Sequence, residues 1–240
     1  MASSLFIWLG SGRARRRRIG PKGRLLDEAA RAGLPVPAGA ILTDELLRLF
    51  VEKGLVESYD GRLIAPHPEL LHNTLFLSVR LPRFDRPVAL KAAFTPSKTS
   101  VPARLNVDLN DAVATTVALA GIWTEAARLP AGARADVLVM EMVAAADHAG
   151  HVLMDHSPTH DVITLRHSND GILLAPALPR LPRGRQPDAE LPPFARRLQM
   201  LVRGVRRTFG HGIRQIEWID DGHICHLIEL LETSEVNAEA

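Results

Sequence analysis

The sequence predicts an α+β protein, built either as one large domain or as two small lobes. Segments with the helical repeat of apolar residues and short, continuous apolar segments both occur along its 240 residues. A chain of this length can bury a sizeable core. The composition, with 46% hydrophobic and 23% charged residues, is typical of a soluble globular protein. No apolar run approaches the roughly 18 residues that span a bilayer.

Helical periodicity is clearest in four parts of the chain. The predicted helices cover residues 24–32, 44–53, 109–129 and 194–209. Gly33 ends the first helix, because glycine readily adopts the left-handed backbone conformation that follows a helix, and Thr43 is expected to cap the second. Before the first helix, residues 20–23 are predicted to form a tight turn that carries Lys22.

Short apolar runs predict the strands. They cover residues 75–79, 88–94, 137–143, 152–154, 162–165, 213–218 and 224–228. The last two are expected to pair in antiparallel fashion around Asp220-Asp221-Gly222, and Asp60-Gly61 marks a further turn. Residues 175–193 are rich in proline and arginine, which predicts a surface connection or a crossing from lobe to lobe.

Charge and cysteine content narrow the possible functions. The net charge is only +2, so the charge of the whole protein does not indicate a positive electrostatic field that would attract nucleic acid. One local cluster contains Arg13, Arg15, Arg16, Arg17 and Arg18. It is either a solvated flexible arm or a contact for phosphates, RNA or an acidic partner, and the lack of interleaved aromatic residues argues against single-stranded nucleic acid. The single Cys225 excludes an internal disulfide, favours a cytoplasmic location and is expected to be buried.

A family resemblance begins in residues 18–43, RIGPKGRLLDEAARAGLPVPAGAILT. A G-x-K-G sequence precedes a short helix and then AGLPVPxGxxLT, which resembles the opening of the nucleotide-binding domain of phosphoenolpyruvate synthase and pyruvate phosphate dikinase. Four later segments are similar to further family elements in the same order: VALKAA at 88–93, LNV at 105–107, VMEMV at 139–143 and a segment ending in QIEW at 210–218.

The resemblance implies an ATP-grasp-like fold, in which two lobes of mixed sheet with helices clasp ATP and magnesium sits at the phosphates. The N-terminal lobe would cover residues 1–100, including a basic arm at 1–18. The C-terminal lobe would cover residues 101–240, including the connection at 175–193. The swivelling histidine domain and the keto-acid barrel of the full-length family do not fit in this chain, so we expect a protein partner to supply them.

Candidate nucleotide contacts follow from the matched motifs. Lys22 and Lys91 would meet phosphates as point charges, although either is also readable as a solvated surface lysine. Glu141 interrupts an apolar strand where the family places adenine and ribose, and a buried glutamate there needs a ligand or a bonded partner. Met142 and Val143 would offer backbone groups to the adenine edge.

Glu217 and Glu229 are the candidate magnesium ligands, because hard cations prefer oxygen ligands such as carboxylates on neighbouring strands. The two side chains lie opposite each other only if the strand connection is centred near His223. A tight hairpin at Asp221-Gly222 would place them on opposite faces. The alternative interpretation is a pair of ordinary edge carboxylates.

The chain departs from the family pattern mainly at the phosphate end. The family's V-R-S-S is replaced by Lys91, Ala92 and Ala93, the flap at 94–104 lacks glycine, G-L-G-E is unrecognisable in 164–174, and Leu231 replaces an arginine. Losing one such cation typically costs about 10² to 10³ in rate.

Two hypotheses therefore remain open. The first is a stand-alone ATP-binding phosphotransferase domain that passes a phosphoryl group to a partner histidine or a small acceptor. The second is a catalytically inactive relic that serves as a binding or assembly subunit of a larger complex. Binding of nucleic acid through residues 13–18 is the least favoured interpretation. The histidines at 148–167 lack a regular spacing for metal ligands, which favours structural or surface roles.

Overall fold

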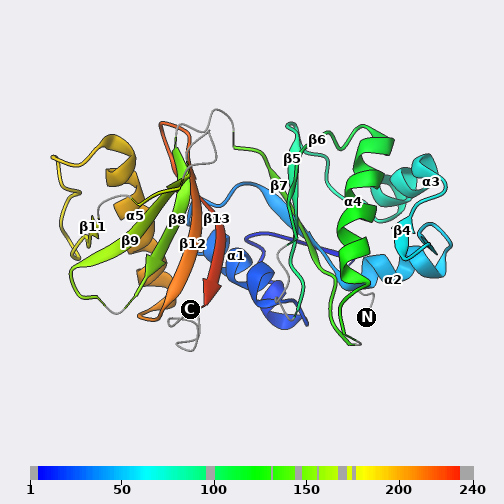
Figure 1. The fold of residues 1–240 in the computed structure, drawn as a ribbon, viewed down its shortest axis with the longest axis horizontal. Coiled ribbons are helices and arrows are strands. Elements are labelled where there is room, and N and C mark those ends of the chain that lie inside the picture. Colours follow the sequence, from blue (N-terminus) through cyan, green and yellow to red (C-terminus); the bar gives the residue numbers. More distant parts are fainter. Residues whose placement is uncertain are drawn as a thin grey trace. The chain divides into compact units, whose positions relative to one another are not determined.

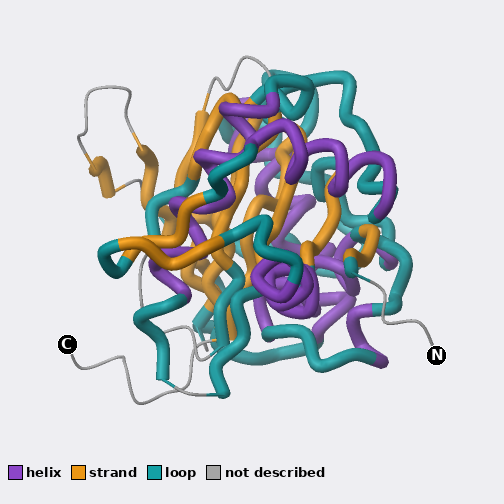
Figure 2. The backbone as a smooth tube through the Cα atoms, turned by 90° about the vertical axis from the view of Figure 1, so that its right-hand side faces the viewer, coloured by secondary structure: helices purple, strands orange, loops and turns teal. Residues whose placement is uncertain are grey.

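The computed structural model describes residues 5–95, 101–130, 132–143, 148–155, 157–166, 172–174 and 177–232. The chain divides into two compact units. Unit 1 comprises Met1–Asp27 and Ala38–Met142, and unit 2 comprises Glu28–Pro37 and Val143–Ala240. Both units combine strands with helices, so the predicted α+β class is confirmed (Figure 2). No described helix is both long enough and apolar enough to cross a membrane.

Unit 1 is built on a five-stranded sheet in the order β1-β2-β7-β5-β6, whose described neighbours are all antiparallel. Its strands are β1 (Phe6–Trp8), β2 (Gly39–Leu42), β5 (Val88–Ala92), β6 (Arg104–Val107) and β7 (Val137–Glu141). Because β6 and β7 complete this sheet, the unit extends to Met142. The boundary near residue 100 expected from the sequence is thus not where the compact units divide.

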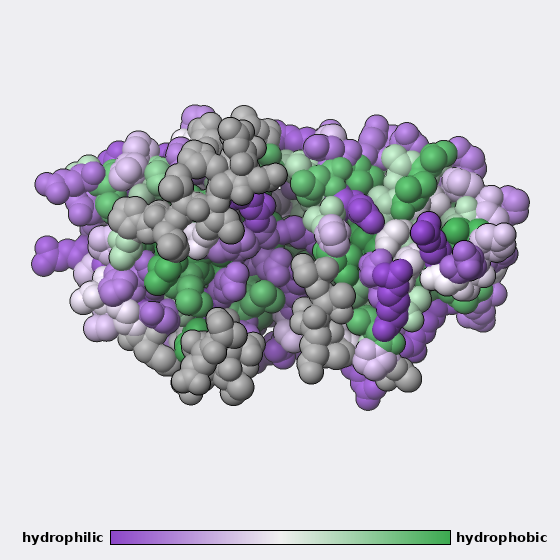
Figure 3. Space-filling model, in the orientation of Figure 1, coloured by the Kyte–Doolittle hydropathy of each residue, from purple (hydrophilic) through white to green (hydrophobic). Residues whose placement is uncertain are grey.

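The helices of unit 1 are α1 (Pro21–Arg31), which continues into unit 2, α2 (Asp44–Glu52), α3 (Pro68–Asn73) and α4 (Ala112–Ala126). In Figure 1, α4 lies between the sheet and a small hairpin of β3 (Glu57–Tyr59) and β4 (Arg62–Ile64). Phe50 of α2 packs edge-on against Trp123 of α4, with ring centroids 6.0 Å apart. The outward side of α4 is also partly apolar, since Val113 and Val117 are exposed, and Figure 3 shows hydrophobic residues on this part of the surface.

Turn chemistry explains the hairpin and the start of α4. Asp60 and Gly61 both have positive φ, at 48° and 70°, as a two-residue hairpin turn requires, so the predicted turn is confirmed. The side chain of Asp111 accepts a hydrogen bond from the amide of Ala114 and caps α4. Thr43 occupies the cap position of α2 but makes no capping bond with its side chain.

The strand predicted at residues 75–79 is wrong. Residues Thr74–Ser78 form a π-helical turn that continues α3. Leu71, Leu75 and Phe76 are buried along this helical stretch, so the apolar run covers one side of a helix rather than both faces of a strand.

Residues 13–18 are not a flexible arm. Ala14–Arg16 form a 3-10 helix, and Ala14 is buried. The buried carboxylate of Asp27 accepts hydrogen bonds from the amides of Gly12 and Ala14, at 3.0 and 2.9 Å, which fastens this segment to α1. Its arginine side chains remain exposed.

Unit 2 is built on a six-stranded antiparallel sheet with the main order β10-β9-β8-β12-β13, and β11 also pairs with β9. Its strands are β8 (His148–Met154), β9 (His160–Arg166), β10 (Ile172–Leu174), β11 (Leu178–Pro179), β12 (Arg214–Asp220) and β13 (Cys225–Glu232). The antiparallel pairing expected for the last two strands is confirmed.

Helix α5 (Pro193–Phe209) covers one face of this sheet (Figure 1). Phe194 of α5 stacks on Trp218 of β12, and Gly210 ends the helix with φ 75°. Cys225 is buried as expected, and burial raises the pKa of its thiol. Within the connection predicted at 175–193, the described part contains only the short strand β11 before α5 begins.

Candidate functional site

In unit 1, the start of α1 lies against the end of β5. A Cβ added at Gly20 would lie 2.3 Å from Thr95 Oγ1 and 3.0 Å from the carbonyl oxygen of Ala93, so a side chain there would push the two segments apart. The segment that carries Lys22 and the segment that follows Lys91 are therefore adjacent. This is the pair of lysine-bearing segments that the sequence analysis assigns to phosphate.

Lys22 lies in the first turn of α1, since the helix begins at Pro21; the turn predicted at 20–23 is therefore wrong. Proline suits this position because the first helical residues need no amide hydrogen-bond donor. The first turn of α1 contains no acidic residue of its own, and the carboxylate of Asp136 accepts a hydrogen bond from the amide of Gly20 just before the helix. A helix start with an adjacent lysine has the electrostatics of an anion site.

A buried carboxylate fixes this corner of unit 1. Asp136 is fully buried and accepts hydrogen bonds from the amides of Gly20 and Asp44, at 3.2 and 2.9 Å. Arg134 pairs with both Asp136 and Glu45, at 3.1 Å each. Burial raises the pKa of Asp136, although the bonds from Arg134 and the two amides oppose that effect. Asp136 thus holds the starts of α1 and α2 in place.

The predicted adenine contacts lie at the end of β7. Glu141 pairs with Val88 of β5 and is half-buried at the strand end, which lowers the desolvation cost that an interior glutamate would carry. The amide of Met142 donates to the carbonyl oxygen of Pro87 at 3.0 Å, so Met142 has only its carbonyl to offer an adenine edge. Val143 follows as the first residue of this part of unit 2.

In unit 2, Glu217 of β12 and Glu229 of β13 are direct partners across the two strands. Residues 221–224 connect the strands, and a register shift after Glu217 adjusts the pairing toward the turn. The connection is thus longer than a two-residue hairpin, and the condition for placing both carboxylates on one face is met. Both glutamates are half-buried.

The same row continues across the sheet. Glu217 also pairs with His151 of β8, and His151 pairs with Thr164 of β9. Arg166 of β9 reaches this row: its guanidinium lies 3.2 Å from Glu217 Oε1 and 3.3 Å from His151 Nε2. Because residues alternate along a strand, this row lies on the face away from α5, whereas Ile216 and Trp218 are buried on the α5 side.

These residues fit a magnesium ion that also binds phosphate. Mg²⁺ is commonly held by one or two carboxylates together with waters and substrate phosphates. Within the described residues no three His, Cys, Asp or Glu side chains gather into a complete metal site. A cation at Glu217 and Glu229 would therefore take its other ligands from water and from a nucleotide. The side chain of Arg166 is 56% exposed, so it is able to move from Glu217 to a phosphate.

Sequence reasoning missed the roles of His151, Arg166 and Asp136. The first two join the glutamates through strand register, which only the assembled sheet defines. Their polar side chains within alternating strands were the available signal. The structure also places positions at which the chain departs from the family pattern. Ala93 is buried. Leu231 lies two residues from Glu229 and opposite Gln215, so an arginine at 231, as in the family, would project from the same face as Glu229.

Comparisons with solved structures give three similar proteins. They are D-alanine–D-alanine ligase from Bacillus anthracis (12% identity, TM-score 0.45, 93% of this chain and 58% of that chain), the corresponding ligase from Helicobacter pylori (12%, 0.47, 89% and 57%) and N5-carboxyaminoimidazole synthase from Aspergillus clavatus in complex with ADP and 5-aminoimidazole ribonucleotide (14%, 0.40, 88% and 44%). The chain thus spans 44% to 58% of the length of these proteins. No protein-family model and no curated protein matches it.

Proposed function

We propose that this chain is an ATP-binding domain of the ATP-grasp type, of the kind found in phosphoenolpyruvate synthase and pyruvate phosphate dikinase. The observation that carries the proposal is the pairing of Glu217 with Glu229 on one face of the unit 2 sheet. Two carboxylates opposite each other on neighbouring strands form the protein part of a magnesium–phosphate site. The match of residues 18–43 to the family opening supports the same assignment.

Unit 1 would supply the cations for the phosphates. Lys22 in the first turn of α1 and Lys91 on β5 belong to adjacent segments, and the helix start adds partial positive charge. Glu141 and the backbone of Met142 and Val143 would contact the nucleoside. When bound, ATP supplies the phosphoryl group, and Mg²⁺ neutralises its charge.

The proposed reaction is phosphoryl transfer to a histidine or a small acceptor presented by a protein partner. Lys91 is a point charge in place of the family's bidentate arginine, and Leu231 adds no charge on the carboxylate face. The chain's own residues would thus bind and orient ATP, and a partner would contribute to turnover.

Nucleotide binding is tested by thermal unfolding in the presence of Mg-ATP. Saturation at a hundredfold excess over Kd stabilises the folded state by about 2.7 kcal/mol, so the melting temperature should rise with nucleotide concentration. Lys22→Ala should reduce this rise. Arg24→Ala, which removes an exposed cation from the same helix, is the matched control and should retain it. An unchanged melting temperature at millimolar Mg-ATP would refute the proposed function.

A further inference from the structure

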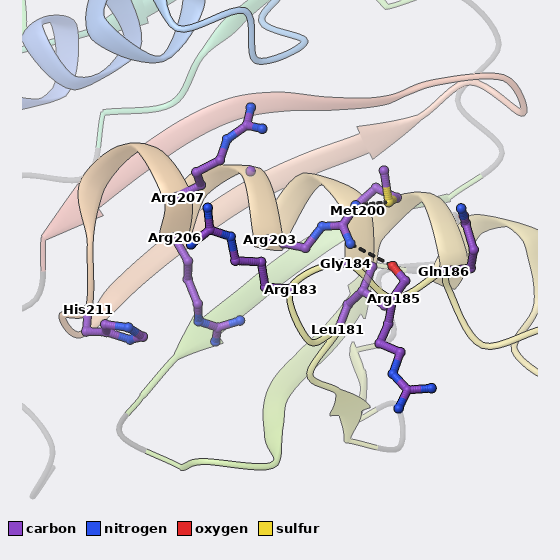
Figure 4. Close-up of a pocket in the computed structure, with 11 residues that line it drawn as sticks. Leu181, Arg183, Gly184, Arg185, Gln186, Met200, Arg203, Arg206, Arg207 and His211 are labelled. Atoms are coloured by element: carbon purple, nitrogen blue, oxygen red, sulfur yellow. Dashed lines mark hydrogen bonds between the residues drawn. The ribbon is translucent and has the colours of Figure 1, made fainter.

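An arginine-rich groove runs beside the outer face of α5 in unit 2 (Figure 4). Its main cavity has a volume of about 840 Å³, and an adjoining cavity of about 400 Å³ shares Gln186 and Met200 with it. We call the two together the α5 groove. The main cavity lies within the range of roughly 300–1,000 Å³ that is typical of small-molecule sites.

The α5 groove is separate from the proposed magnesium site. The side of α5 that faces the sheet meets Trp218 through the stacking of Phe194. Arg197 lines the adjoining cavity and pairs with the buried Asp220 of the same strand as Trp218. Glu217 alternates with these residues and lies on the opposite face of the sheet. An anion in the groove would therefore not contact the carboxylate row.

The sequence of α5 creates a basic outer stripe. Its buried residues include Leu198, Leu201 and Val205, whereas Arg196, Arg203 and Arg207 recur at helical spacing on the other side. The helix contains no aspartate or glutamate. The facing loop adds further positive charge and likewise brings no acid to the groove: none of its described lining residues is acidic.

The loop contributes Arg183 and Arg185, on either side of Gly184, whose φ of 77° marks a turn that glycine makes without strain. In Figure 4 the side chains of Arg183 and Arg185 leave this turn in different directions. The carbonyl oxygen of Arg185 accepts a hydrogen bond from Arg203 at 2.8 Å (Figure 4). This bond fixes the guanidinium of Arg203 at the wall of the groove.

The charges of the groove are only partly used inside the protein. Arg206 pairs with the buried Asp161 and is thereby neutralised. Arg183 and Arg207 are exposed and form no ion pair with any described residue. Together with Arg185 and Arg203 they make four arginines that line the main cavity and form no ion pair with a described residue. Like charges in this arrangement repel one another, and a bound anion would offset that repulsion.

We propose that the α5 groove binds a small anion with adjacent phosphate groups, at a second site apart from the proposed ATP site. Guanidinium groups match phosphate oxygens in bidentate geometry, and several around one cavity match several phosphates. The described lining contains no Phe, Tyr or Trp on which bases of a single-stranded nucleic acid would stack. The phosphate chain itself is therefore the recognised group.

Calorimetric titration with inorganic tripolyphosphate, in the absence of Mg²⁺, tests this site. We expect binding that weakens with rising salt, and about a tenfold loss of affinity in Arg183→Gln and in Arg207→Gln. Both residues are exposed, so these variants should fold normally. Arg62→Gln is the control, because it removes an equal charge from the exposed hairpin strand β4 of unit 1.

Three results would overturn the proposal: no binding at millimolar tripolyphosphate, equal losses in Arg62→Gln and the groove variants, or tighter binding of a single-stranded oligonucleotide that the groove variants leave unchanged. Failure of the Mg-ATP experiment would not affect this test, because the groove variants leave the glutamate pair and the two lysines intact.

Discussion

Among the described carboxylates, three buried aspartates differ in their surroundings from the pair of Glu217 and Glu229. Asp136, Asp161 and Asp220 are buried, and each is paired with arginine. They hold elements together. Glu217 and Glu229 instead lie half-buried, opposite each other, on the sheet face away from α5. Glu217 pairs with Arg166, whose side chain is 56% exposed, and in the proposed function a magnesium ion would take the place of that arginine.

Asp136→Asn should be strongly destabilising. The change removes a buried negative charge that Arg134 and the amides of Gly20 and Asp44 share. Breaking a buried pair by removing one partner costs about 3–5 kcal/mol of the free energy of unfolding. Urea unfolding followed by circular dichroism measures this loss. Asp85→Asn, at an exposed position, should stay within about 0.5 kcal/mol of the wild type, and equal effects would contradict the assigned role.

Asp221 should make stability depend on pH in the acid range. Its carboxylate accepts hydrogen bonds from the amide of Ile224 and from His226, and these lower its pKa below the ordinary value of 3.8. A lowered pKa stabilises the folded state fully above the ordinary value, and the stabilisation is lost as the pH falls toward the folded-state pKa. Asp221→Asn should therefore lower the melting temperature more at about pH 7 than at about pH 3.

The control for this pH dependence is Asp60→Asn, because Asp60 is exposed at a turn where asparagine tolerates positive φ. Its effect on the melting temperature should be small at both pH values. An Asp221→Asn effect of the same size at both would show that charge is not the cause.

At the scale of elements, most helices and strands could be predicted because their apolar periodicity reflects burial on one side. Residues 75–79 show the limit of prediction from periodicity. A continuous run of apolar residues has neither the helical nor the strand period, and only the packing of Leu75 and Phe76 in the core makes it helical. The row of Glu217, Glu229 and His151 depends on strand register. Register is set by turn length and by a bulge, and neither can be read from one strand alone.

The spacing of β8 and β9 should be sensitive to a single methyl group. A Cβ at Gly150 would lie 1.9 Å from the carbonyl oxygen of Thr164. The clash is with backbone, which cannot move aside as the end of a flexible side chain can. Gly150→Ala should cost about 1–3 kcal/mol or more of the free energy of unfolding. Gly121, inside helix α4, is the comparison position. The methyl group added in Gly121→Ala meets only the flexible end of the Arg104 side chain, at 3.3 Å.

Gly121→Ala should therefore be neutral or stabilise the protein by up to about 1 kcal/mol, because alanine favours helix more than glycine does. Urea denaturation of the two variants side by side makes the comparison. If Gly150→Ala proved as stable as Gly121→Ala, the close packing of β8 on β9 would be refuted.

For the whole molecule, the sequence predicted an α+β protein and a family resemblance that runs through both units. It did not reveal where the compact units divide, because the sheet of unit 1 takes its strands β6 and β7 from beyond residue 100. Nor did it reveal the α5 groove, whose arginines come from a loop and a helix separated in the sequence. The net charge of +2 gave no indication of the strongly basic surface at the α5 groove.

The central claim is that Glu217 and Glu229 hold the magnesium of a bound ATP. Calorimetric titration of ATP with Mg²⁺ and with a chelator tests it most directly. We predict that Mg²⁺ tightens ATP binding by about tenfold or more in the wild type, and that Glu217→Gln and Glu229→Gln abolish this gain. Glu232→Gln, on the same strand, should retain it. ATP affinity that does not depend on Mg²⁺, or a Mg²⁺ gain that survives in both glutamate variants, would contradict the claim.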